Sequence, residues 1–521
     1  MKKQFLLIAG LVFIDALAFG GGIVTNSNQS AYWVRTLVRD AAIGPDAVYF
    51  NPAGLTRMED GFHFSLNSQT IFQNKDVTSD YIYLNPTPKK YLGEAKAPVF
   101  PGAYATWKKN KIAVSFGFNP IGGGGSATFK TGLPSFELSI ADLAKAFESQ
   151  GATDYRLDAY LKGTSVFFGY QGGISYKIND MISVFGGVRY VTGKNTYEGH
   201  LKDIDLLMGG NWIPASNILQ GVATSASDAA NMVQAAIDGG VIGASDPISQ
   251  TLANNLIAFG VDPTGFTNAI AVVALGQASD GYNAKAALLA GQEVDVVEKG
   301  AGFTPILGVN FSFEGKLNIG IKYEFRTKIE VENETTKDFI LGYSGSTPIT
   351  MFPNGEKIDN DLPAMFSLGV DYKIIPKLSA TAGFHYYFDK SANYGKQLNG
   401  EYVDNSEVID KNYYEIATGL EYGITDNVFI SGGYLFAKSG VGDDYQSDLS
   451  YSLTSNSIGG GLGIKLTEKF MVNAGFLYSI YNEGKKTYDH IFPAVGNPIL
   501  KVTDTYFENN LVFALGIDFS F

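Results

Sequence analysis

Apolar and polar residues alternate one by one along several segments of the chain. In residues 317–326, Leu, Ile, Tyr and Phe occupy every second position, and Asn, Gly, Lys, Glu and Arg lie between them. Successive side chains of a β-strand point to opposite faces, so this period of two predicts a strand with one apolar and one polar face. The same alternation predicts strands at residues 166–178, 182–192, 378–388, 428–436, 458–466, 470–480 and 511–521.

Short polar turns divide the predicted strands into pairs. They lie at residues 108–110, 179–180, 314–316, 375–377, 425–427 and 467–469, and longer polar or glycine-rich stretches connect one pair to the next. One strand after Gly61, two strands around each of the six turns and a last strand starting near Glu508 make fourteen. Tight turns at one rim and long loops at the other are typical of bacterial transmembrane barrels, which have even strand numbers. We therefore predict an all-β fold, a 14-stranded antiparallel transmembrane β-barrel over residues 61–521.

The composition of the chain argues against several other classes of protein. After the N-terminus, no run of about 18 consecutive apolar residues is long enough for a transmembrane helix. The net charge is −13 and no basic cluster is visible, which argues against a nucleic-acid partner. The 61 glycines, the 13% aromatic content and the absence of cysteine all fit a barrel.

Candidate catalytic chemistry is sparse. None of the four histidines has the spacing of a metal-ligand pair, and there is no phosphate-binding Gly-Lys-Ser/Thr loop. His385 and Asp389 share one face of a predicted strand, but no convincing nucleophile accompanies them. We therefore predict no metal site, no cofactor and no enzymatic activity.

The two ends of the chain carry targeting signals. Lysines at positions 2 and 3, an apolar stretch over residues 5–14 and Ala16-Leu17-Ala18 predict a secretory signal peptide over residues 1–18. A buried N-terminal strand or helix is the alternative, but it leaves these features unexplained. The chain ends on Phe521, which closes an amphipathic strand. This end resembles the signal that the barrel assembly machinery of the bacterial outer membrane recognises.

Residues 19–60 show little alternation and contain a distinctive motif. The run Asp46-Ala47, followed by Phe50-Asn51-Pro52-Ala53-Gly54 just before the first strand, resembles the N-terminal hatch of the FadL/TodX outer-membrane transporters. The resemblance implies a 14-stranded barrel with residues 19–60 as a hatch in its lumen. It also implies transport of long-chain fatty acids or aromatic hydrocarbons.

The residues of this motif favour a plug on physical grounds too. Pro52 lacks an N–H group and makes Asn51 extended, so the segment resists becoming another barrel strand. The amide of Asn51 can bond polar lumen groups, for example on the face of Lys322, Glu324 and Arg326. We therefore assign Asn51, Pro52, Ala53 and Gly54 to the hatch and its gating. The alternative is that Asn-Pro only starts a surface turn.

Residues 203–300 are a second irregular region. Asp246-Pro247 and Asp262-Pro263 each supply an N-cap with proline at the first helical position, and apolar residues follow at helical spacing. They predict short amphipathic helices in a long extracellular loop. The family resemblance implies an apolar groove that captures the ligand, whereas the alternative is that the helices pack on each other and cap the barrel.

A third irregularity lies in the third predicted strand. Asn119 and Pro120 are followed by four glycines that include Gly122 and Gly123, and proline with consecutive glycines should end this strand abruptly. In the resembled family a kink in the third strand opens the barrel wall sideways. Loop flexibility is the alternative explanation.

These features predict a protein of the Gram-negative outer membrane, in contact with lipid bilayer and lipopolysaccharide, that takes up hydrophobic compounds passively. Long-chain fatty acids are the first candidate ligand, and aromatic or other hydrophobic compounds are the second. A general porin or a surface adhesin with a barrel anchor remains open. Arg189, Arg326 or Lys177, on the lumen-facing side of their strands, could pair a carboxylate, and pairing with Glu324 or Asp518 is the alternative.

Overall fold

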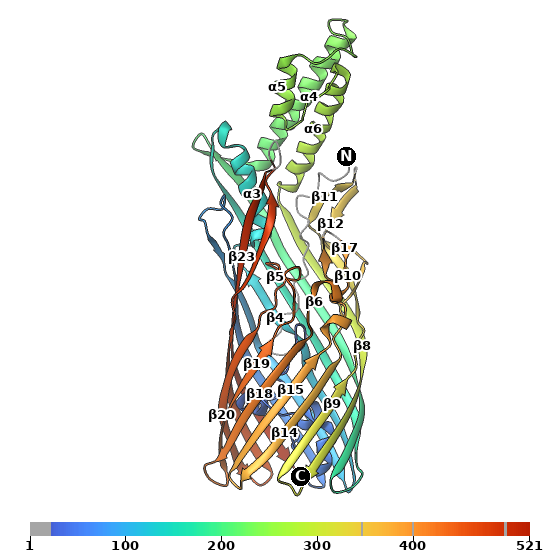
Figure 1. Cartoon of the computed structure of the whole chain (residues 1–521), viewed down its shortest axis with the longest axis vertical. Helices are drawn as coiled ribbons and strands as arrows, with labels where there is room; N and C mark the ends of the chain where they lie inside the picture. Colours follow the sequence, from blue (N-terminus) through green and yellow to red (C-terminus); the bar gives the residue numbers. More distant parts are fainter. Residues whose placement is uncertain (1–21, 345–346, 399–400, 494–497) are drawn as a thin grey trace.

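The computed structural model describes residues 22–344, 347–398, 401–493 and 498–521. Fourteen antiparallel strands form a closed barrel in which the first strand pairs with the last (Figure 1), so the predicted fold class is confirmed. Around the barrel the strands are β1 (Gly61–Ser79), β3 (Gly93–Lys109), β4 (Ile112–Phe129), β5 (Ala152–Lys177), β6 (Ile182–Met208), β8 (Gln292–Phe313), β9 (Leu317–Glu324), β14 (Met365–Ile375), β15 (Leu378–Tyr387), β18 (Tyr413–Gly423), β19 (Val428–Lys438), β20 (Ser455–Thr467), β21 (Phe470–Tyr481) and β23 (Ile499–Ser520).

Smaller elements lie in the lumen and in the loops. The short strands are β2 (Lys89–Tyr91), β7 (Asn211–Pro214), β10 (Glu330–Lys337), β11 (Ile340–Ser344), β12 (Thr347–Thr350), β13 (Lys357–Asp359), β16 (Gln397–Leu398), β17 (Glu401–Tyr402) and β22 (Gly484–Ile491). The helices are α1 (Ala31–Thr36), α2 (Ala47–Phe50), η1 (Pro52–Arg57), α3 (Pro134–Ala146), η2 (Glu148–Gln150), α4 (Ala215–Asp238), α5 (Gln250–Ala258), α6 (Asn268–Leu288), η3 (Asp389–Ser391) and α7 (Asn405–Val408). Among the described residues, no helix combines the length and the hydrophobicity needed to cross a bilayer.

Two predicted strand limits are wrong. The third barrel strand, β4, does not end at its glycines but continues to Phe129, because bulges absorb the irregular backbone there. The last strand starts at Ile499 rather than near Glu508, because its first residues form a hairpin with β22 beyond the barrel wall.

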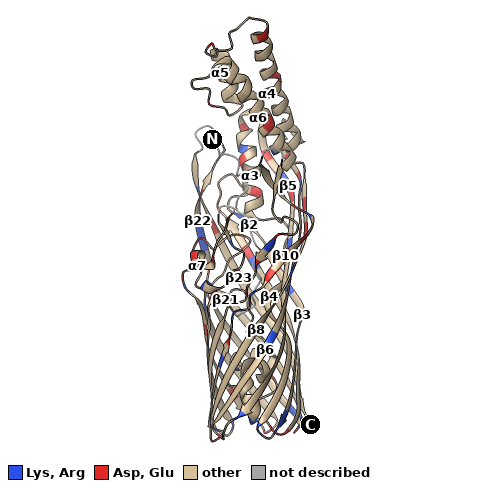
Figure 2. Ribbon diagram, turned by 90° about the vertical axis from the view of Figure 1, so that its right-hand side faces the viewer, with Lys and Arg blue, Asp and Glu red and all other residues tan. Residues whose placement is uncertain are grey.

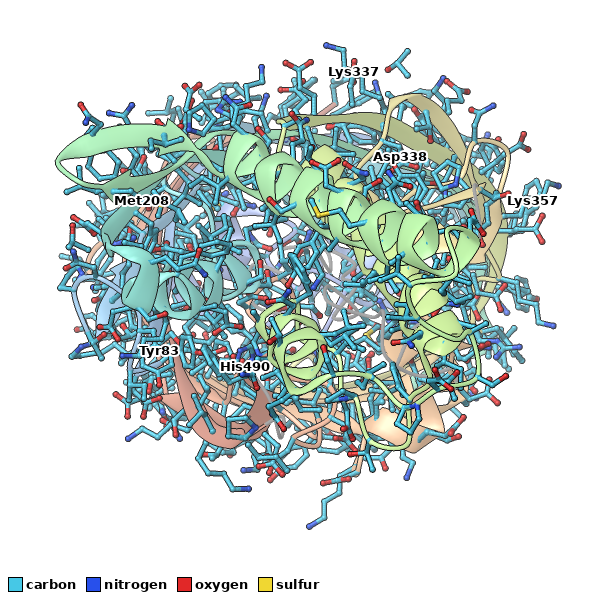
Figure 3. The ribbon with its side chains drawn as sticks, turned by 90° about the horizontal axis from the view of Figure 1, so that it is seen from above. Tyr83, Met208, Lys337, Asp338, Lys357 and His490 are labelled. Atoms are coloured by element: carbon cyan, nitrogen blue, oxygen red, sulfur yellow. The ribbon has the colours of Figure 1, made fainter. Side chains whose placement is uncertain are left out.

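The predicted helical loop contains three helices that extend beyond the loop end of the barrel (Figure 1), and Figure 3 shows them from above. The N-caps of α5 and α6 are Ser249 and Thr267, whose side chains accept bonds from backbone N–H groups, and not Asp246 and Asp262 as expected. Leu252 and Leu256 are buried among the helices, as the packing alternative requires. Ile270 and Val273 are 46% and 59% exposed. The helix α4 was not anticipated.

Exposed and half-buried aromatic side chains form bands on the barrel wall. Farther from the tight turns, neighbouring rings with centroids 4.9–6.5 Å apart form two runs, which we call the upper girdle: Phe118, Phe168, Tyr170, Tyr190 and Phe303, then Phe325, Tyr323, Phe388, Tyr386, Phe384, Tyr414 and Phe436. At the turn end, Phe62, Phe64, Phe519 and Phe521 pack together. Aliphatic side chains such as Leu66, Leu307 and Leu515 are exposed on the same wall. An apolar wall with aromatic bands is the pattern of a transmembrane barrel.

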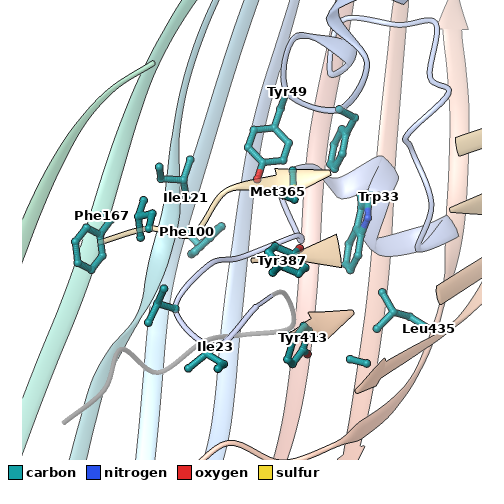
Figure 4. Packing of buried hydrophobic residues seen from close by; sticks show 14 of the residues in the cluster. Ile23, Trp33, Tyr49, Phe100, Ile121, Phe167, Met365, Tyr387, Tyr413 and Leu435 are labelled. Carbon is teal, nitrogen blue, oxygen red and sulfur yellow. The ribbon is translucent and has the colours of Figure 1, made fainter. Parts of the chain in front are cut away.

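Residues 22–60, which we call the lumenal segment, lie inside the barrel (Figure 4). Helix α1 contacts β1 and the strands from β18 to β23, and η1 contacts the strands from β3 to β8, so the segment reaches across the whole lumen. The predicted signal peptide over residues 1–18 lies outside the described residues.

A row of wall glycines brings the lumenal segment into direct contact with the strand backbones. A Cβ on Gly320 would lie 2.0 Å from the carbonyl oxygen of Asp40, and a Cβ on Gly433 would lie 2.2 Å from that of Thr36. Any side chain at these positions would displace the segment. We call the row the glycine seat: Gly320, Gly369, Gly383, Gly419, Gly433, Gly459, Gly461, Gly475 and Gly516.

Candidate functional site

Asn51 joins the lumenal segment to the barrel wall. Its Nδ2 donates to the Ala42 carbonyl at 3.1 Å and to Asn310 Oδ1 on β8 at 2.7 Å. Asn310 and Asn318 exchange hydrogen bonds, and Asn318 Nδ2 donates to the Ala41 carbonyl at 2.6 Å. Asn318 belongs to the face of β9 from which we expected the partners of Asn51, although the direct partner is on β8. These three buried amides hold the turn before η1 in place.

The other motif residues also contact the wall. Ser175 Oγ donates to the Pro52 carbonyl at 2.6 Å, and Ser183 Oγ donates to the Ala53 carbonyl at 2.8 Å. A Cβ on Gly54 would lie 2.5 Å from Asn51 Nδ2, so only glycine fits there without a shift. The motif is a packed turn in the lumen, and its gating role stays a prediction.

A buried charged cluster lies beside the lumenal segment. Arg189 on β6 forms a two-point ion pair with Glu324 on β9, with N–O distances of 2.6 and 3.1 Å. Lys322 Nζ donates to Glu324 at 2.7 Å and to the Tyr49 carbonyl at 2.7 Å. Burial, followed by the nearby Glu324, raises the pKa of Tyr49 well above its ordinary value, so this phenol stays protonated.

The three candidate carboxylate partners have different positions. Arg189 is paired with Glu324, which is one of the two alternative partners that the sequence analysis named. Arg326 is about a third exposed and lies 3.7 Å from Asp361. Lys177 pairs with Asp180 at a tight turn, away from the cluster. Asp518 accepts a bond from Asn473 Nδ2 at 2.8 Å.

His385 links the lumenal segment to the barrel wall and does not pair with Asp389. Its two ring nitrogens lie 2.6 Å from Asp40 Oδ1 and 2.8 Å from Glu415 Oε2, and all three groups are buried. Asp389 lies in η3, where it accepts bonds from Tyr394 and from the backbone of Tyr413. Among the described residues, no group of three or more His, Cys, Asp or Glu is placed to hold a metal ion.

Strands β3 and β4 separate in the middle of their ladder. Lys96 pairs with Ser126, and the next pair is Ala103 with Phe118, so residues 97–102 and 119–125 have no partners on each other's strand. The predicted kink residues Asn119, Pro120, Gly122 and Gly123 all lie in this unpaired stretch. Gly123 has a φ of +79°, a conformation that favours glycine. The interruption of the ladder thus includes the four residues singled out in the sequence, although β4 does not end there, and their role as a lateral opening stays a prediction.

The lumenal segment supplies the missing partners of β4. Backbone bonds join Asn26 N–H to the Ile121 carbonyl at 2.9 Å and Gly123 N–H to the Val24 carbonyl at 3.1 Å. Thr25 and Gly122 form an isolated antiparallel bridge. In the stretch where β4 leaves β3, it therefore bonds to the segment in the lumen.

Gln29 contacts both sides of the break. Its side chain accepts from Asn119 Nδ2 at 2.6 Å and donates to the Pro120 carbonyl at 2.9 Å. Its backbone carbonyl accepts from Tyr104 on β3 at 2.7 Å. Sequence analysis missed this residue, because a lone glutamine outside any motif gives no signal.

A pocket borders the same break. Ile121 lines it from the unpaired stretch of β4, and the lumenal segment contributes Thr25 and Tyr49. Leu362, Met365 and other apolar side chains line another side, with Arg189 and Glu324 as the charged groups. The arrangement is a small cavity with mixed walls, in which apolar side chains alternate with Thr304, Thr327 and one internally neutralised ion pair, next to a break in the barrel wall.

Solved structures share this architecture. A FadL homologue from Pseudomonas aeruginosa is 13% identical, with a TM-score of 0.58 over 96% of this chain and 100% of that chain. The toluene transporter TodX from Pseudomonas putida is 12% identical, with a TM-score of 0.50 over 97% of this chain and 100% of that chain. A TodX mutant described as a monoaromatic hydrocarbon channel is 13% identical, with a TM-score of 0.53 over 94% and 99%.

The likeness to FadL and TodX suggested by the Asn-Pro-Ala-Gly motif is thus confirmed at the level of the fold. Two of these structures are described as a toluene transporter and a monoaromatic hydrocarbon channel. No protein-family model matches the sequence, and no curated protein matches it.

Proposed function

We propose, from this FadL-type fold, that the chain is a channel of the Gram-negative outer membrane for passive uptake of hydrophobic compounds. The observation that carries the proposal is the break between β3 and β4 beside a pocket with partly apolar walls, in a barrel whose lumen holds residues 22–60. The lumenal segment contacts strands on both sides of the barrel, so a ligand that enters at the loop end meets it, and the break offers a lateral exit.

In this proposal the lumenal segment is the hatch, and Asn51, Pro52, Ala53 and Gly54 fix its turn. Asn119, Pro120, Gly122 and Gly123 form the lateral exit, from which an apolar ligand passes into the bilayer. Residues 1–18 direct export, and Phe521 is the signal for the barrel assembly machinery. The backbones of Phe521 and Phe62 exchange hydrogen bonds of 2.9 and 2.8 Å, so this residue closes the seam between β1 and β23 at the turn end.

Transport needs no energy source in this mechanism. Ligand binding shifts the equilibrium between hatch positions by the difference in affinity for them. The hatch is held by directional polar bonds to Asn310, Ser175 and Ser183, which can exchange for others as it moves. A general porin is disfavoured because a water-filled pore requires an open lumen.

The pocket favours an uncharged ligand. Arg189 and Glu324 neutralise each other in its wall, so a carboxylate would have to compete with Glu324 for the guanidinium. An aromatic or other neutral hydrophobic compound meets no such competition. A long-chain fatty acid, the first candidate from the sequence, becomes the second candidate here, and it stays in consideration because Lys322 leaves the three-residue cluster with one excess positive charge.

Uptake assays in cells lacking their own outer-membrane hydrocarbon and fatty-acid transporters test this proposal. Radiolabelled toluene and oleate should each be followed with and without this protein, at matched surface levels. We expect a several-fold gain for toluene and a smaller gain for oleate. The control is the oxidised Ala53→Cys/Gly308→Cys variant, whose Cβ positions lie 3.8 Å apart and whose disulfide would hold the hatch against β8. No gain for either compound from a folded, surface-located barrel would reject the proposed function.

A further inference from the structure

The barrel wall has a second interruption, between β8 and the strands that follow it in the chain. The ladder with β9 covers residues 306–313 of β8, and the ladder with β10 covers residues 295–299. In the described part of the chain, residues 300–305 of β8 therefore have no partner on β9 or β10. On its other edge, the same stretch pairs with β6 without a gap. The interruption is thus confined to one edge of β8.

The sequence explains why the pairing stops here. The Phe325 N–H donates to the Pro305 carbonyl at 3.1 Å, but Pro305 has no N–H to return the second bond of an antiparallel pair. Gly300 then leaves space on the lumen-facing side of β8, where a Cβ would lie 2.5 Å from the Glu330 carbonyl oxygen. The chain after β9 therefore leaves the wall and passes the inner side of β8 before it pairs with it again as β10.

The pocket described above borders this interruption as well as the break between β3 and β4. Thr304 on β8 lines it together with Phe325 and Thr327, and the hydroxyls of the two threonines are hydrogen-bonded. Leu362 lines it from the side of β14 and exchanges backbone bonds of 3.0 Å with Thr327. One pocket therefore touches two interruptions of the wall, and the paired strands β5 and β6 separate them.

Exposure differs between these two places. Among the described residues that line the pocket, only Phe325 is exposed, at 42%, whereas Ile121 at the break between β3 and β4 is 3% exposed. Phe325 belongs to the upper girdle, and its ring packs edge-on against Tyr323 with centroids 4.9 Å apart. Tyr323 lies on the outward face of β9, which alternates with buried lumen-facing residues. The ring of Phe325 therefore lies between the pocket and the outer surface of the wall.

The outer surface around this ring is apolar. Phe303 and Leu307, two residues before and after Pro305 on the same face of β8, are 64% and 54% exposed. Figure 2 shows the charged residues mainly at the tight turns and above the middle of the barrel, so the wall between these levels is mostly uncharged. Aromatic bands mark the boundaries of the hydrocarbon layer. The pocket thus approaches the outer surface where that surface contacts lipid.

We propose that the interruption beside β8 is a second lateral opening of the pocket and that the ring of Phe325 is its gate. A neutral aromatic or aliphatic hydrocarbon passes here between the pocket and the bilayer. The inference rests on the proposed function, from which it takes the class of ligand. Because the Phe325 backbone is held by its bond to Pro305, the ring can change rotamer and uncover the pocket while every ladder stays intact.

Cysteine labelling in lipid nanodiscs tests the opening without any transport. The chain has no native cysteine, so Thr304→Cys places a single thiol in the pocket of the full-length barrel. The probe is monobromobimane, an uncharged thiol reagent that dissolves in membranes. We expect Phe325→Ala to raise the labelling rate of this thiol about tenfold, because the ring and its contact with Tyr323 are lost. An unchanged rate would overturn the gate.

Val191→Cys is the matched control for this labelling. Val191 on β6 is buried, and it lies opposite Gly169 of β5 on one edge and opposite Gly302 of β8 on the other. Its thiol is therefore at a similar level but behind complete ladders. Phe325→Ala should leave its labelling rate unchanged. An equal rise at Val191→Cys and Thr304→Cys would overturn the inference, because the whole barrel would then have loosened.

Uptake of radiolabelled toluene tests whether the ligand uses this opening. Phe325→Trp should lower the uptake rate several-fold, and Phe325→Ala should raise it, at matched surface levels. The control is Phe476→Trp on β21, because Phe476 has a similar exposure of 48% and does not line the pocket. This control should leave uptake unchanged. Unchanged uptake in both Phe325 variants would overturn the opening as a route for the ligand.

The two experiments separate this inference from the proposed function. A folded, unaltered barrel that takes up neither toluene nor oleate would reject the proposed function, whatever the labelling of Thr304→Cys. Normal uptake of toluene by the unaltered barrel, together with labelling and uptake that ignore Phe325, would reject the second opening alone.

Discussion

The imidazole of His385 on β15 lies 2.6 Å from the Asp40 carboxylate of the lumenal segment. Its other nitrogen lies 2.8 Å from Glu415 on β18, so one side chain separates two buried carboxylates and links the segment to two wall strands. Removing the imidazole leaves these carboxylates facing each other, with the Tyr387 hydroxyl, 3.2 Å from Glu415 Oε2, as the remaining side-chain donor to Glu415. Loss of one partner from a buried charged pair is among the most costly single changes in a protein.

We therefore expect His385→Gln to lower the free energy of unfolding by about 3 kcal/mol. It should also allow trypsin to cleave the folded barrel at Arg35 or Arg39. Urea titration in detergent and limited proteolysis measure the two effects. His200→Gln is the control, because His200 pairs with Asp158 on the outer surface and should cost less than about 1 kcal/mol. Full protection of the segment in the His385 variant would contradict its linking role.

The glycine seat predicts a sharp difference between two adjacent positions. A Cβ at Gly433 would overlap the Thr36 carbonyl, whereas a Cβ at Gly432 would have its nearest neighbour at 3.5 Å. Gly433→Ala should destabilise the protein by about 1–3 kcal/mol, as overpacking does, and raise amide hydrogen exchange in α1. Gly432→Ala should leave exchange in α1 unchanged. Similar effects of both substitutions would show that backbone entropy, and not contact with the segment, decides the cost.

A disulfide can test whether the lumenal segment must move during transport. The Cβ of Ala53 lies 3.8 Å from the position of a Cβ on Gly308 of β8, which matches disulfide geometry, and the chain has no native cysteine. The Ala53→Cys/Gly308→Cys variant should lose uptake when oxidised and regain it after reduction. Each single cysteine variant should transport under both conditions. Undiminished uptake by the oxidised protein would reject hatch movement at this point.

Gln29 should control the width of the break between β3 and β4. Gln29→Ala removes the side-chain bonds to Asn119 and Pro120 but keeps the carbonyl bond to Tyr104. At about 1 kcal/mol for each lost bond, we expect faster hydrogen exchange over residues 119–123 and a higher uptake rate for toluene. Gln234→Ala on the exposed face of α4 is the control. Slower uptake with normal folding would mean that Gln29 contacts the ligand instead.

Glu324 should set the preference between neutral and acidic ligands. Glu324→Gln removes the carboxylate that both Arg189 and Lys322 contact, so two cations become available at the pocket. The ratio of oleate uptake to toluene uptake should rise by about tenfold, provided the barrel still migrates as a folded species in unheated gels. Arg189→Gln should lower the same ratio. A ratio unchanged by both variants would exclude this cluster from ligand selection.

The alternating pattern made the barrel predictable because every strand has one face toward lipid and the other toward the lumen. Each strand therefore shows the alternation by itself. Six short turns then determined the number of strands without any knowledge of their pairing. The pattern failed at Gly122–Gly125, where β4 continues by bonding to residues 24–26 instead of β3. Such a partner, about a hundred residues away in the chain, leaves no periodic trace in the sequence.

The position of the motif residues could be predicted from the sequence better than the partners of the charged residues. Asn51-Pro52-Ala53-Gly54 could be assigned to the lumen because proline excludes a regular strand and the motif directly precedes one. The partner of Arg189 could not be chosen between Glu324 and Asp518, because their separation depends on the barrel register. The glycine seat could not be predicted either, because a glycine on the lumen-facing side of a strand gives the same sequence pattern whether or not another backbone packs against it.

The seam between β1 and β23 has a consequence for the order of assembly. The wall becomes a ring only when the first and the last strand pair, and these strands are the most distant in the sequence. The glycine seat leaves no room to thread residues 22–60 through a finished ring, because the wall contacts them backbone to backbone on many strands. The segment must therefore be in place before the seam closes. The wall therefore assembles around the lumenal segment. Closure of the seam fixes both the circumference of the wall and the shape of the enclosed segment.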